Sequence, residues 1–376
     1  MRLAFIKKRF SIHGGAERYL QTLINHLKKE GHEIHVFANT WTEEDGIIFH
    51  KVNLLPLSSF LSNLTFNINV NSKLQTLRSK VKFDCVISFE RTTCQDIYRA
   101  GEGCHAEWLD IRAKTAPFYK RLSFKINPLH ISLLNMEKKL FHDTKLIIAN
   151  SKMVKEQIIR HYAVPEERIN IIYNGVDLRR FNPENKDNRR KDIRDSLNIS
   201  GDIKVLLFVG SGFERKGLQT LIDAVSLIKR DDIMVLVVGK GDIKKYRAAA
   251  FRHGISDKIV FLGTQKGIEK FYAAADLFVL PTLYDPFSNA VLEAMASGLP
   301  VITTKNNGAA ELIEDGHEGF VTQGLFNGQE LSDKINRSLD NLRAMGENAR
   351  EKAEAFPIER AVKEFVEVIE LLFKLK

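Results

Sequence analysis

The chain of 376 residues has little cysteine and no long apolar run. Its three cysteines, Cys85, Cys94 and Cys104, lack the spacing of a metal or redox site, and their odd number argues against a disulfide framework. No segment approaches the ~20 consecutive apolar residues that a membrane-spanning helix needs. The first residues are typical of a buried strand and contain neither the apolar core nor the cleavage site of a signal peptide. These absences predict a cytoplasmic protein.

The rest of the composition is typical of a globular protein. Hydrophobic residues make up 44% of the chain and charged residues 27%, which is an ordinary balance. The length is sufficient for two domains, each with its own core. The segment Asn174–Asp177 is the expected exit from the first domain, so the domains should span residues 1–176 and 177–356. The polar residues 182–191 are the expected linker.

Short apolar strands alternate with helices along nearly the whole chain. This alternation indicates an α/β fold with parallel sheets covered by helices on both faces. The expected strands are residues 3–6, 33–37, 85–89, 146–150, 169–173, 205–209, 234–238, 259–262, 277–280, 301–304 and 319–322. The expected helices include residues 17–29, 73–81, 152–162, 218–227 and 357–373.

Two carboxylates, Asp285 and Glu293, lie eight positions apart just beyond the predicted strand 277–280. Between them, Ser288 or Asn289 can cap a new helix, whose first backbone N–H groups are free to bind a polyhydroxyl or anionic ligand. Two carboxylates that accept hydrogen bonds, beside a row of backbone N–H groups that donate them, suit the binding of a sugar nucleotide. An ordinary loop with two solvated acids is the alternative interpretation.

A glycine-rich turn, residues 210–217, follows the predicted strand 205–209 and contains Arg215 and Lys216. Glycine lets the backbone approach a ligand closely, and both cations suit a diphosphate. Two solvated basic residues in a loop are the alternative. A P-loop would need Lys followed by Ser or Thr directly after the last glycine, where this chain has Leu218, and the third glycine comes too late for a dinucleotide-binding fingerprint.

The spacing from Asp285 to Glu293 and the Arg215-Lys216 pair resemble the motifs of family 4 retaining glycosyltransferases. In that family the first acid is usually Glu, and here it is the shorter Asp. The resemblance implies a GT-B fold, with two Rossmann-like domains facing a central cleft and the C-terminal helix, residues 357–376, returning to the N-terminal domain. It also implies that the first domain binds the acceptor and the second the nucleotide sugar.

The same resemblance implies roles for individual residues. Arg215 and Lys216 would bind the diphosphate and Glu293 the ribose. The hexose would lie against Asp285 and the residues at the start of the next helix, Phe287, Ser288, Asn289 and Ala290.

In the first domain, Gly14 and Gly15 follow the first strand and can approach the donor phosphate. The segment from Arg99 to Trp108 resembles that of lipopolysaccharide-core glucosyltransferases acting on inner-core heptose. It presents Glu102 and His105 as candidate catalytic or acceptor-positioning residues. A loop carboxylate and a hydrogen-bonded structural histidine are the alternative.

The whole excess of positive over negative charge lies in the first half of the chain. Residues 1–175 contain 26 basic and 17 acidic residues, whereas residues 176–376 contain 30 of each. Between residues 111 and 145, basic and apolar residues interleave, which suits an anionic lipid surface. The predicted contact residues are Arg112, Lys114, Lys120, Arg121 and Lys125. No nucleic-acid recognition motif accompanies the charge, so nucleic acid is not an expected partner.

The motifs favour chemistry without a metal or cofactor. No Asp-x-Asp pair, the metal-nucleotide anchor of the other large glycosyltransferase fold, occurs in the chain. The expected function is transfer of glucose from UDP-glucose to a heptose of the lipopolysaccharide core, at the inner face of the cytoplasmic membrane. Two alternatives remain: another nucleotide sugar in capsule, O-antigen or glycolipid synthesis, and a non-catalytic sugar-nucleotide-binding protein.

Overall fold

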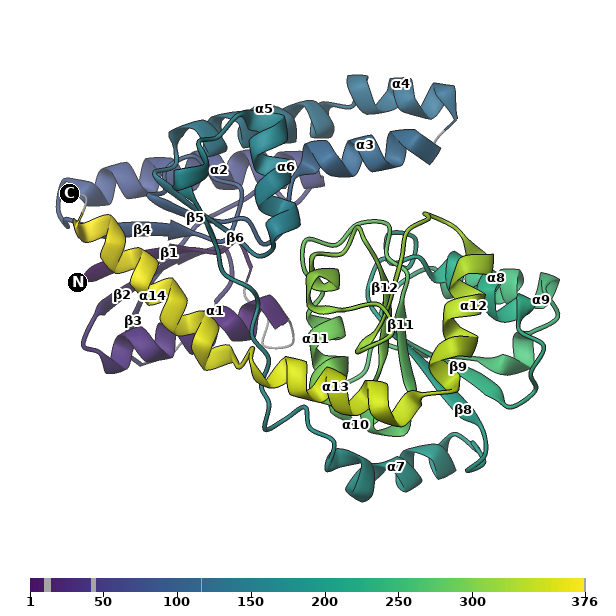
Figure 1. Ribbon diagram of the computed structural model, residues 1–376. Helices are drawn as coiled ribbons and strands as arrows, with labels where there is room; N and C mark the ends of the chain where they lie inside the picture. The colour runs from purple at the N-terminus through teal and green to yellow at the C-terminus, as the bar shows by residue number, and fades with distance from the viewer. Residues whose placement is uncertain (10–14, 42–44, 116, 375–376) are drawn as a thin grey trace. The chain divides into compact units, whose positions relative to one another are not determined.

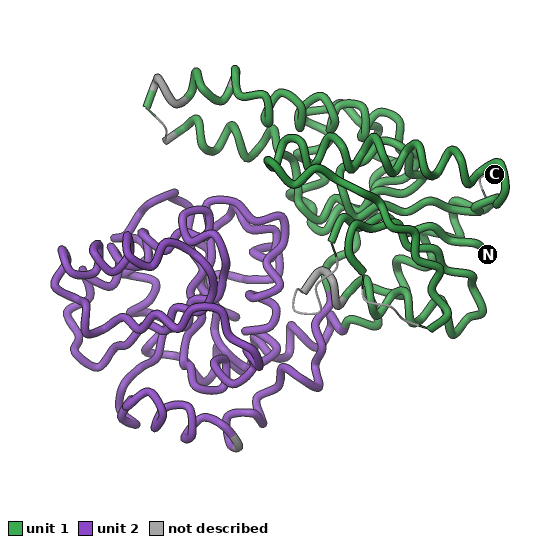
Figure 2. The backbone as a smooth tube through the Cα atoms, turned by 180° about the vertical axis from the view of Figure 1, so that it is seen from behind, with its two compact units in different colours: residues 1–174, 358–376 green, residues 175–357 purple. Residues whose placement is uncertain are grey.

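The computed structural model describes residues 1–9, 15–41, 45–115 and 117–374, with residues 15–18, 115, 118–120, 125 and 188 described by backbone alone. The chain forms two compact units, coloured separately in Figure 2. Unit 1 contains Met1–Asn174 and Ile358–Lys376, and unit 2 contains Gly175–Pro357. The sequence placed the boundaries at 176/177 and 356/357, within two residues of these positions.

Unit 1 is built around a seven-stranded parallel sheet in the order β3-β2-β1-β4-β5-β6-β7. The inner strands are apolar and buried, as expected for a sheet covered on both faces. Its strands are β1 (Arg2–Ile6), β2 (Glu33–Ala38), β3 (Ile47–Lys51), β4 (Cys85–Ser88), β5 (Ile97–Arg99), β6 (Leu146–Ala149) and β7 (Ile169–Ile171). Its helices are α1 (Gly15–Lys29), α2 (Ser59–Arg78), α3 (His105–Thr115), α4 (Phe118–Ile126), α5 (Pro128–Asp143), α6 (Lys152–Tyr162) and α14 (Ile358–Lys374).

The C-terminal helix α14 belongs to unit 1 and lies beside α1 (Figure 1). Its apolar face, including Phe365 and Ile369, is part of the core formed with β1, β2 and α1. The Tyr19 hydroxyl of α1 donates a hydrogen bond to the Ala361 carbonyl of α14 at 3.1 Å. The expected return of the last helix to the first domain is therefore confirmed.

Unit 2 is built around a six-stranded parallel sheet in the order β10-β9-β8-β11-β12-β13. Its strands are β8 (Lys204–Val209), β9 (Ile233–Val238), β10 (Ile259–Gly263), β11 (Leu277–Leu280), β12 (Val301–Thr304) and β13 (Gly319–Thr322). Its helices are α7 (Asn185–Ser196), α8 (Leu218–Leu227), α9 (Ile243–Arg252), α10 (Glu269–Ala274), α11 (Asn289–Ala296), α12 (Gly328–Leu339) and α13 (Leu342–Glu354). The predicted α/β fold with two Rossmann-like sheets is confirmed.

The expected linker at residues 182–191 was wrong, because most of this segment lies in helix α7 of unit 2. Arg190 and Arg194 on α7 both form ion pairs with Asp276, each at 2.6 Å. Asp276 precedes β11 and lies 86 residues from Arg190 in the chain. Two of the charged residues on this helix therefore pair with a carboxylate that is distant in the sequence and are not solvated linker residues.

Strands β3 and β5 were not predicted. β3 is an edge strand of partly buried and exposed residues whose apolar run, Ile47–Phe49, is only three residues long, and β5 also has only three residues. Helix α2 is longer than the predicted segment 73–81, starting at Ser59 behind the N-cap Ser58. Within the described residues, no helix is both long and apolar enough to cross a membrane.

Replacing Ile369 by Ala should destabilise unit 1, because this α14 side chain is fully buried in the core. A Leu/Ile to Ala change in a core typically costs about 2–5 kcal/mol. Leu371→Ala, on the same helix but 41% exposed, should change stability by less than about 1 kcal/mol. Both tryptophans, Trp41 and Trp108, lie in unit 1, so denaturant unfolding followed by tryptophan fluorescence reports this unit. Equal stability of the two variants would contradict the placement of α14.

Candidate functional site

A buried ion pair joins the two predicted donor motifs in unit 2. The Lys216 ammonium contacts the Asp285 carboxylate, and the two residues are 9% and 6% exposed. Lys216 follows β8, and Asp285 follows β11, its neighbour in the sheet. Because the carboxyl ends of parallel strands share one edge of the sheet, the fold brings the two motifs together at the place where such folds bind ligands.

Arg215 links the same two loops through its backbone and its side chain. Its carbonyl accepts hydrogen bonds from the Leu283 N–H at 2.8 Å and the Thr282 hydroxyl at 2.9 Å. Its guanidinium donates to the Tyr284 carbonyl at 3.0 Å. The basic pair and the acidic loop therefore form one hydrogen-bonded assembly.

Two asparagines after β12, Asn306 and Asn307, hold the backbone of Asp285. The Asp285 N–H donates to the Asn306 carbonyl, and the Gly308 N–H donates to the Asp285 carbonyl, both at 2.9 Å. The Asn307 side chain accepts the Ser288 N–H at 3.1 Å. Sequence reasoning missed both asparagines, although their position directly after a strand of the same sheet was a usable signal.

The helix that follows Asp285, α11, begins at Asn289, as the sequence predicted to within one residue. Ser288 occupies the N-cap position, but its hydroxyl makes no capping hydrogen bond to the helix. Phe287 and Ser288 are buried, whereas Asn289 and Ala290 are partly exposed. The predicted hexose-binding residues thus lie together at the start of one helix.

Glu293 lies further along α11 and accepts a hydrogen bond from the Tyr272 hydroxyl at 2.9 Å. Burial raises the pKa of Glu293 to about 7, against the opposing effects of Tyr272 and of the Arg180 charge. Arg180 itself pairs with Glu269 at 2.8 Å. Tyr272 and Arg180 are further site residues that sequence reasoning missed, since neither stands in a recognisable motif.

In unit 1, the candidate residues Glu102 and His105 lie on the turn between β5 and α3 but have different partners. Glu102 forms an ion pair with Arg91, and Arg91 holds the pKa of that carboxyl below its usual range. His105 Nε2 is 2.9 Å from His130 Nδ1, and burial lowers the pKa of His105 to about 4. His105 is therefore neutral near pH 7. Of the predicted glycines, Gly15 begins α1, and Gly14 lies outside the described residues.

The predicted basic surface falls on α3 and α4. The Arg112 guanidinium lies 4.5 Å from the centre of the Phe124 ring and 5.7 Å from that of Trp108. Arg121 lines an apolar cavity of about 580 Å³ formed by α3, α4 and α5. Lys114 is exposed, and the side chains of Lys120 and Lys125 lie outside the described part.

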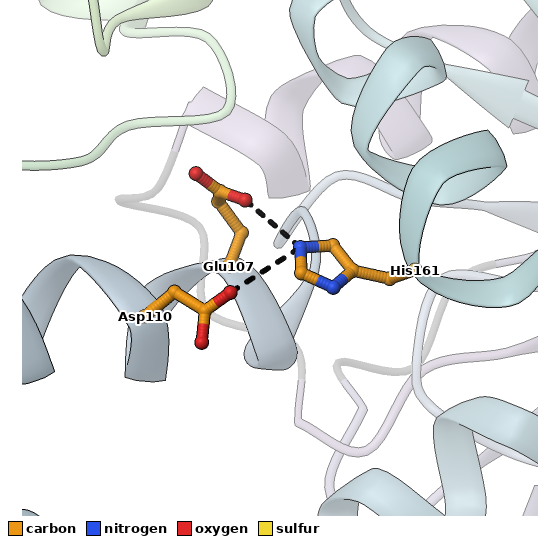
Figure 3. Close-up of side chains that lie close together, drawn as sticks. All are labelled: Glu107, Asp110 and His161. Carbon is orange, nitrogen blue, oxygen red and sulfur yellow. Dashed lines mark hydrogen bonds and ion pairs between the residues drawn. The ribbon is translucent and has the colours of Figure 1, made fainter.

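Glu107, Asp110 and His161 approach one another between α3 and α6 (Figure 3). His161 Nε2 is 2.9 Å from Glu107 and 4.0 Å from Asp110. The Arg160 guanidinium also contacts Glu107. Because Arg160 supplies the charge that a metal ion would supply, this cluster is explained as an ion-pair contact between the two helices.

Family comparisons match both halves of the chain. Residues 13–180 match the sequence model described as Glycosyltransferase Family 4, and residues 189–352 match Glycosyl transferases group 1. The lipopolysaccharide glucosyltransferase WaaG of Escherichia coli K12 is 28% identical over 363 residues, covering 94% of each chain. The glycosyltransferase MJ1607 of Methanocaldococcus jannaschii is 32% identical over 183 residues, covering 48% of this chain and 47% of its own.

Solved structures agree with these matches. A crystal structure of WaaG aligns with a TM-score of 0.84 at 25% identity, covering 98% of this chain and 99% of its own. Anabaena HepE in complex with UDP and glucose shares the fold, with a TM-score of 0.76 at 21% identity and coverage of 98% and 99%. The expected GT-B class, two parallel-sheet domains with the last helix on the first, is confirmed.

Replacing Gly217 by Ala should disrupt the donor motif. Gly217 has a φ of +76°, and a Cβ atom there would lie 1.8 Å from the Pro281 carbonyl oxygen. We expect unit 2 to lose more than about 4 kcal/mol of unfolding free energy. Gly212→Ala is the matched control, because its φ is +77° but no atom lies within 4 Å of the added Cβ. Its cost should be about 1–2 kcal/mol.

Thermal unfolding followed by circular dichroism compares the two glycine variants. Similar losses for both would show that the backbone angle dominates and that the approach to Pro281 is not as tight as described.

Proposed function

The chain belongs to glycosyltransferase family 4, and we propose that it is a retaining, metal-independent enzyme that transfers glucose from UDP-glucose to a heptose of the lipopolysaccharide inner core. The observation that carries the donor part of this proposal is the buried contact between Lys216 and Asp285. It couples a cationic group suited to a diphosphate with a carboxylate suited to sugar hydroxyls.

In the proposed reaction, Arg215 and Lys216 bind the diphosphate of the donor. The departing nucleoside diphosphate gains negative charge in the transition state, so fixed cations stabilise that state more than the ground state. These side chains take the electrostatic role that a metal ion has in other enzymes of this reaction class. Glu293 accepts hydrogen bonds from the ribose, and Asp285 with the start of α11 binds the hexose.

In unit 1, Gly14 and Gly15 approach the donor phosphate. Glu102 or His105 assists the transfer at the anomeric carbon or positions the acceptor. The neutral state of His105 near pH 7 suits hydrogen bonding to an acceptor hydroxyl. Glu102, in contrast, supplies a negative charge.

The choice of substrates rests on the relatives. WaaG is a lipopolysaccharide glucosyltransferase and matches nearly the whole chain at 28% identity. HepE was crystallised with UDP and glucose. A second candidate function is transfer of another sugar in capsule, O-antigen or glycolipid synthesis, which the shorter Asp285 at the first acidic position favours. A non-catalytic sugar-nucleotide-binding protein is the remaining alternative.

We also propose that α3 and α4 rest on the anionic inner face of the cytoplasmic membrane, where a lipid-linked acceptor is found. Leu122 and Ile126 of α4 are 53% and 67% exposed, next to the apolar cavity lined by Arg121. Exposed apolar side chains beside basic ones are typical of helices that bind lipid surfaces. Each basic residue near such a surface contributes about 1 kcal/mol.

The proposed activity is tested by measuring UDP release from a panel of nucleotide sugars, with EDTA present. The acceptor is lipopolysaccharide core with exposed heptose, presented in vesicles of anionic or neutral lipid. We expect acceptor-dependent turnover of UDP-glucose, faster on anionic vesicles. Lys216→Ala should lower kcat about 100-fold or more, because it removes a cation that stabilises the leaving group.

Each result of this assay has a distinct meaning. Turnover of another donor would favour the second candidate function, and turnover abolished by EDTA would contradict the metal-independent mechanism. Equal binding and turnover on neutral vesicles would contradict the membrane contact. Donor binding without turnover on any acceptor would favour the binding protein.

Donor affinity should depend on the protonation of Glu293. Because the pKa of Glu293 is raised to about 7, the carboxyl loses its proton as the pH rises through that value. The ionised carboxylate is the stronger acceptor for ribose hydroxyls. Affinity for UDP-glucose, measured by calorimetry, should therefore increase from about pH 6 to about pH 8. Glu293→Gln should remove this dependence, and an unchanged pH profile in that variant would assign the effect to another group.

A further inference from the structure

A fully buried carboxylate, Glu137 of α5, lies beneath the turn that carries Glu102 and His105. It accepts hydrogen bonds from Arg91 Nε at 2.8 Å, from the His105 backbone N–H at 2.8 Å and from the Tyr162 hydroxyl. The donors come from the loop after β4, from the start of α3 and from the end of α6. A buried carboxylate is tolerated when it is paired and hydrogen-bonded in this way.

Arg91 connects Glu137 to the turn through all three nitrogens of its guanidinium. Nε donates to Glu137, Nη1 to Glu102, and Nη2 to the Gly103 carbonyl at 3.1 Å. Gly103 has a φ of +65°, so the chain reverses here in a conformation that favours glycine. Because the guanidinium is planar and rigid, fixing Nε on Glu137 also fixes the positions of the other two contacts.

We infer that Arg91 and Glu137 are positioning residues that hold Glu102 as a fixed carboxylate, so that Glu102 acts in the transfer reaction through its negative charge and not by exchanging a proton. This inference rests on the proposed function, since it assigns Glu102 a role in the transfer reaction.

The charges around Glu102 support the electrostatic role. Arg91 lowers the pKa of Glu102 most, and Lys7 and Lys8 lower it further, while the Glu102 side chain itself is 56% exposed. A carboxylate with a low pKa is a poor proton acceptor near neutral pH. It can still stabilise the positive charge that develops on a sugar in an oxocarbenium-like transition state. Among the described residues, the titratable and charged groups facing Glu102 and its partner Arg91 are Lys7, Lys8, Tyr98, Cys104, His105, Glu137 and Tyr162.

Glu137 also explains why the start of α3 is held in place. Its two oxygens accept the His105 N–H at 2.8 and 3.0 Å, and negative charge at a helix N-terminus is stabilising. The Glu137 carboxylate therefore anchors His105 by its backbone, while the His130 contact orients the His105 ring. One buried residue thus sets the position of both candidate side chains.

The experiment measures kcat and KM against pH, with the donor and acceptor that the wild-type protein uses. Its variants are Glu102→Gln, Arg91→Met, and Arg91→Met combined with Glu137→Gln. The double variant is included because Arg91→Met alone leaves Glu137 as a buried charge without its cation. Arg160→Met is the matched control, since Arg160 forms an ion pair with Glu107 outside this network and its side chain is 60% exposed.

We expect Glu102→Gln to lower kcat about 100-fold with little change in KM. Without Arg91, the pKa of Glu102 should rise towards the ordinary value of about 4.3. The acid limb of the kcat profile should therefore move to higher pH in both Arg91 variants. As the pH falls, Glu102 then takes up its proton and loses its negative charge at a higher pH than in the wild-type protein. Arg160→Met should leave the limb and kcat unchanged. Trp108 on α3 provides a fluorescence signal that the turn and helix are still folded.

An acid limb at the wild-type position in both Arg91 variants would overturn the inference, and so would a wild-type kcat in Glu102→Gln. Both of these results can be obtained only if the wild-type protein is active. They therefore differ from the result that would reject the proposed function, in which the wild-type protein itself shows no turnover. Absence of wild-type turnover with every donor and acceptor would reject the proposed function and this inference with it.

Discussion

The candidate site in unit 2 depends on the buried contact between Lys216 and Asp285. Removing two charges from water is costly, and their attraction offsets that cost only when the geometry is good and the remaining polar atoms are hydrogen-bonded. Arg215 and Asn307 support that geometry, because they bond the two loops that carry the pair to each other and to the start of α11. The pair spans 69 residues of sequence, so it forms only when β8 and β11 are neighbours in the sheet.

Unit 1 also contains a buried ion pair whose desolvation is offset by further hydrogen bonds. Arg91 and Glu137, 46 residues apart, form a buried pair whose other hydrogen bonds go to the turn after β5. In both units the strands themselves are apolar, and the polar residues lie where the strands end. Parallel strands all end at the same edge, so each unit gathers its polar groups in one place. There a network that is fully hydrogen-bonded can be both buried and rigid.

How many of the strands and helices could be predicted from the sequence depended on how clear the residue pattern of each segment was. Strands β8, β9 and β11 of unit 2 were predictable because each is a short, almost fully buried apolar run. Strand β3 at the sheet edge is partly exposed, and its apolar run ends after three residues, at Phe49, so the strand was not predicted. Helix α7 was expected to be a linker because it is rich in charged residues. Two of them, Arg190 and Arg194, form ion pairs with Asp276 and hold the helix on unit 2.

The fold class could be inferred from the chain alone, because residue type and position after a strand are local properties. The same holds for the candidate residues Arg215, Lys216, Asp285, Glu293 and Glu102. Which groups contact these residues depends on the tertiary structure. Asn307, Tyr272, Arg91 and Glu137 have no motif of their own, and each reaches its partner through the order of strands in a sheet or the packing of helices. Periodicity is set by neighbours along the chain, whereas ion pairing and desolvation are set by neighbours in space.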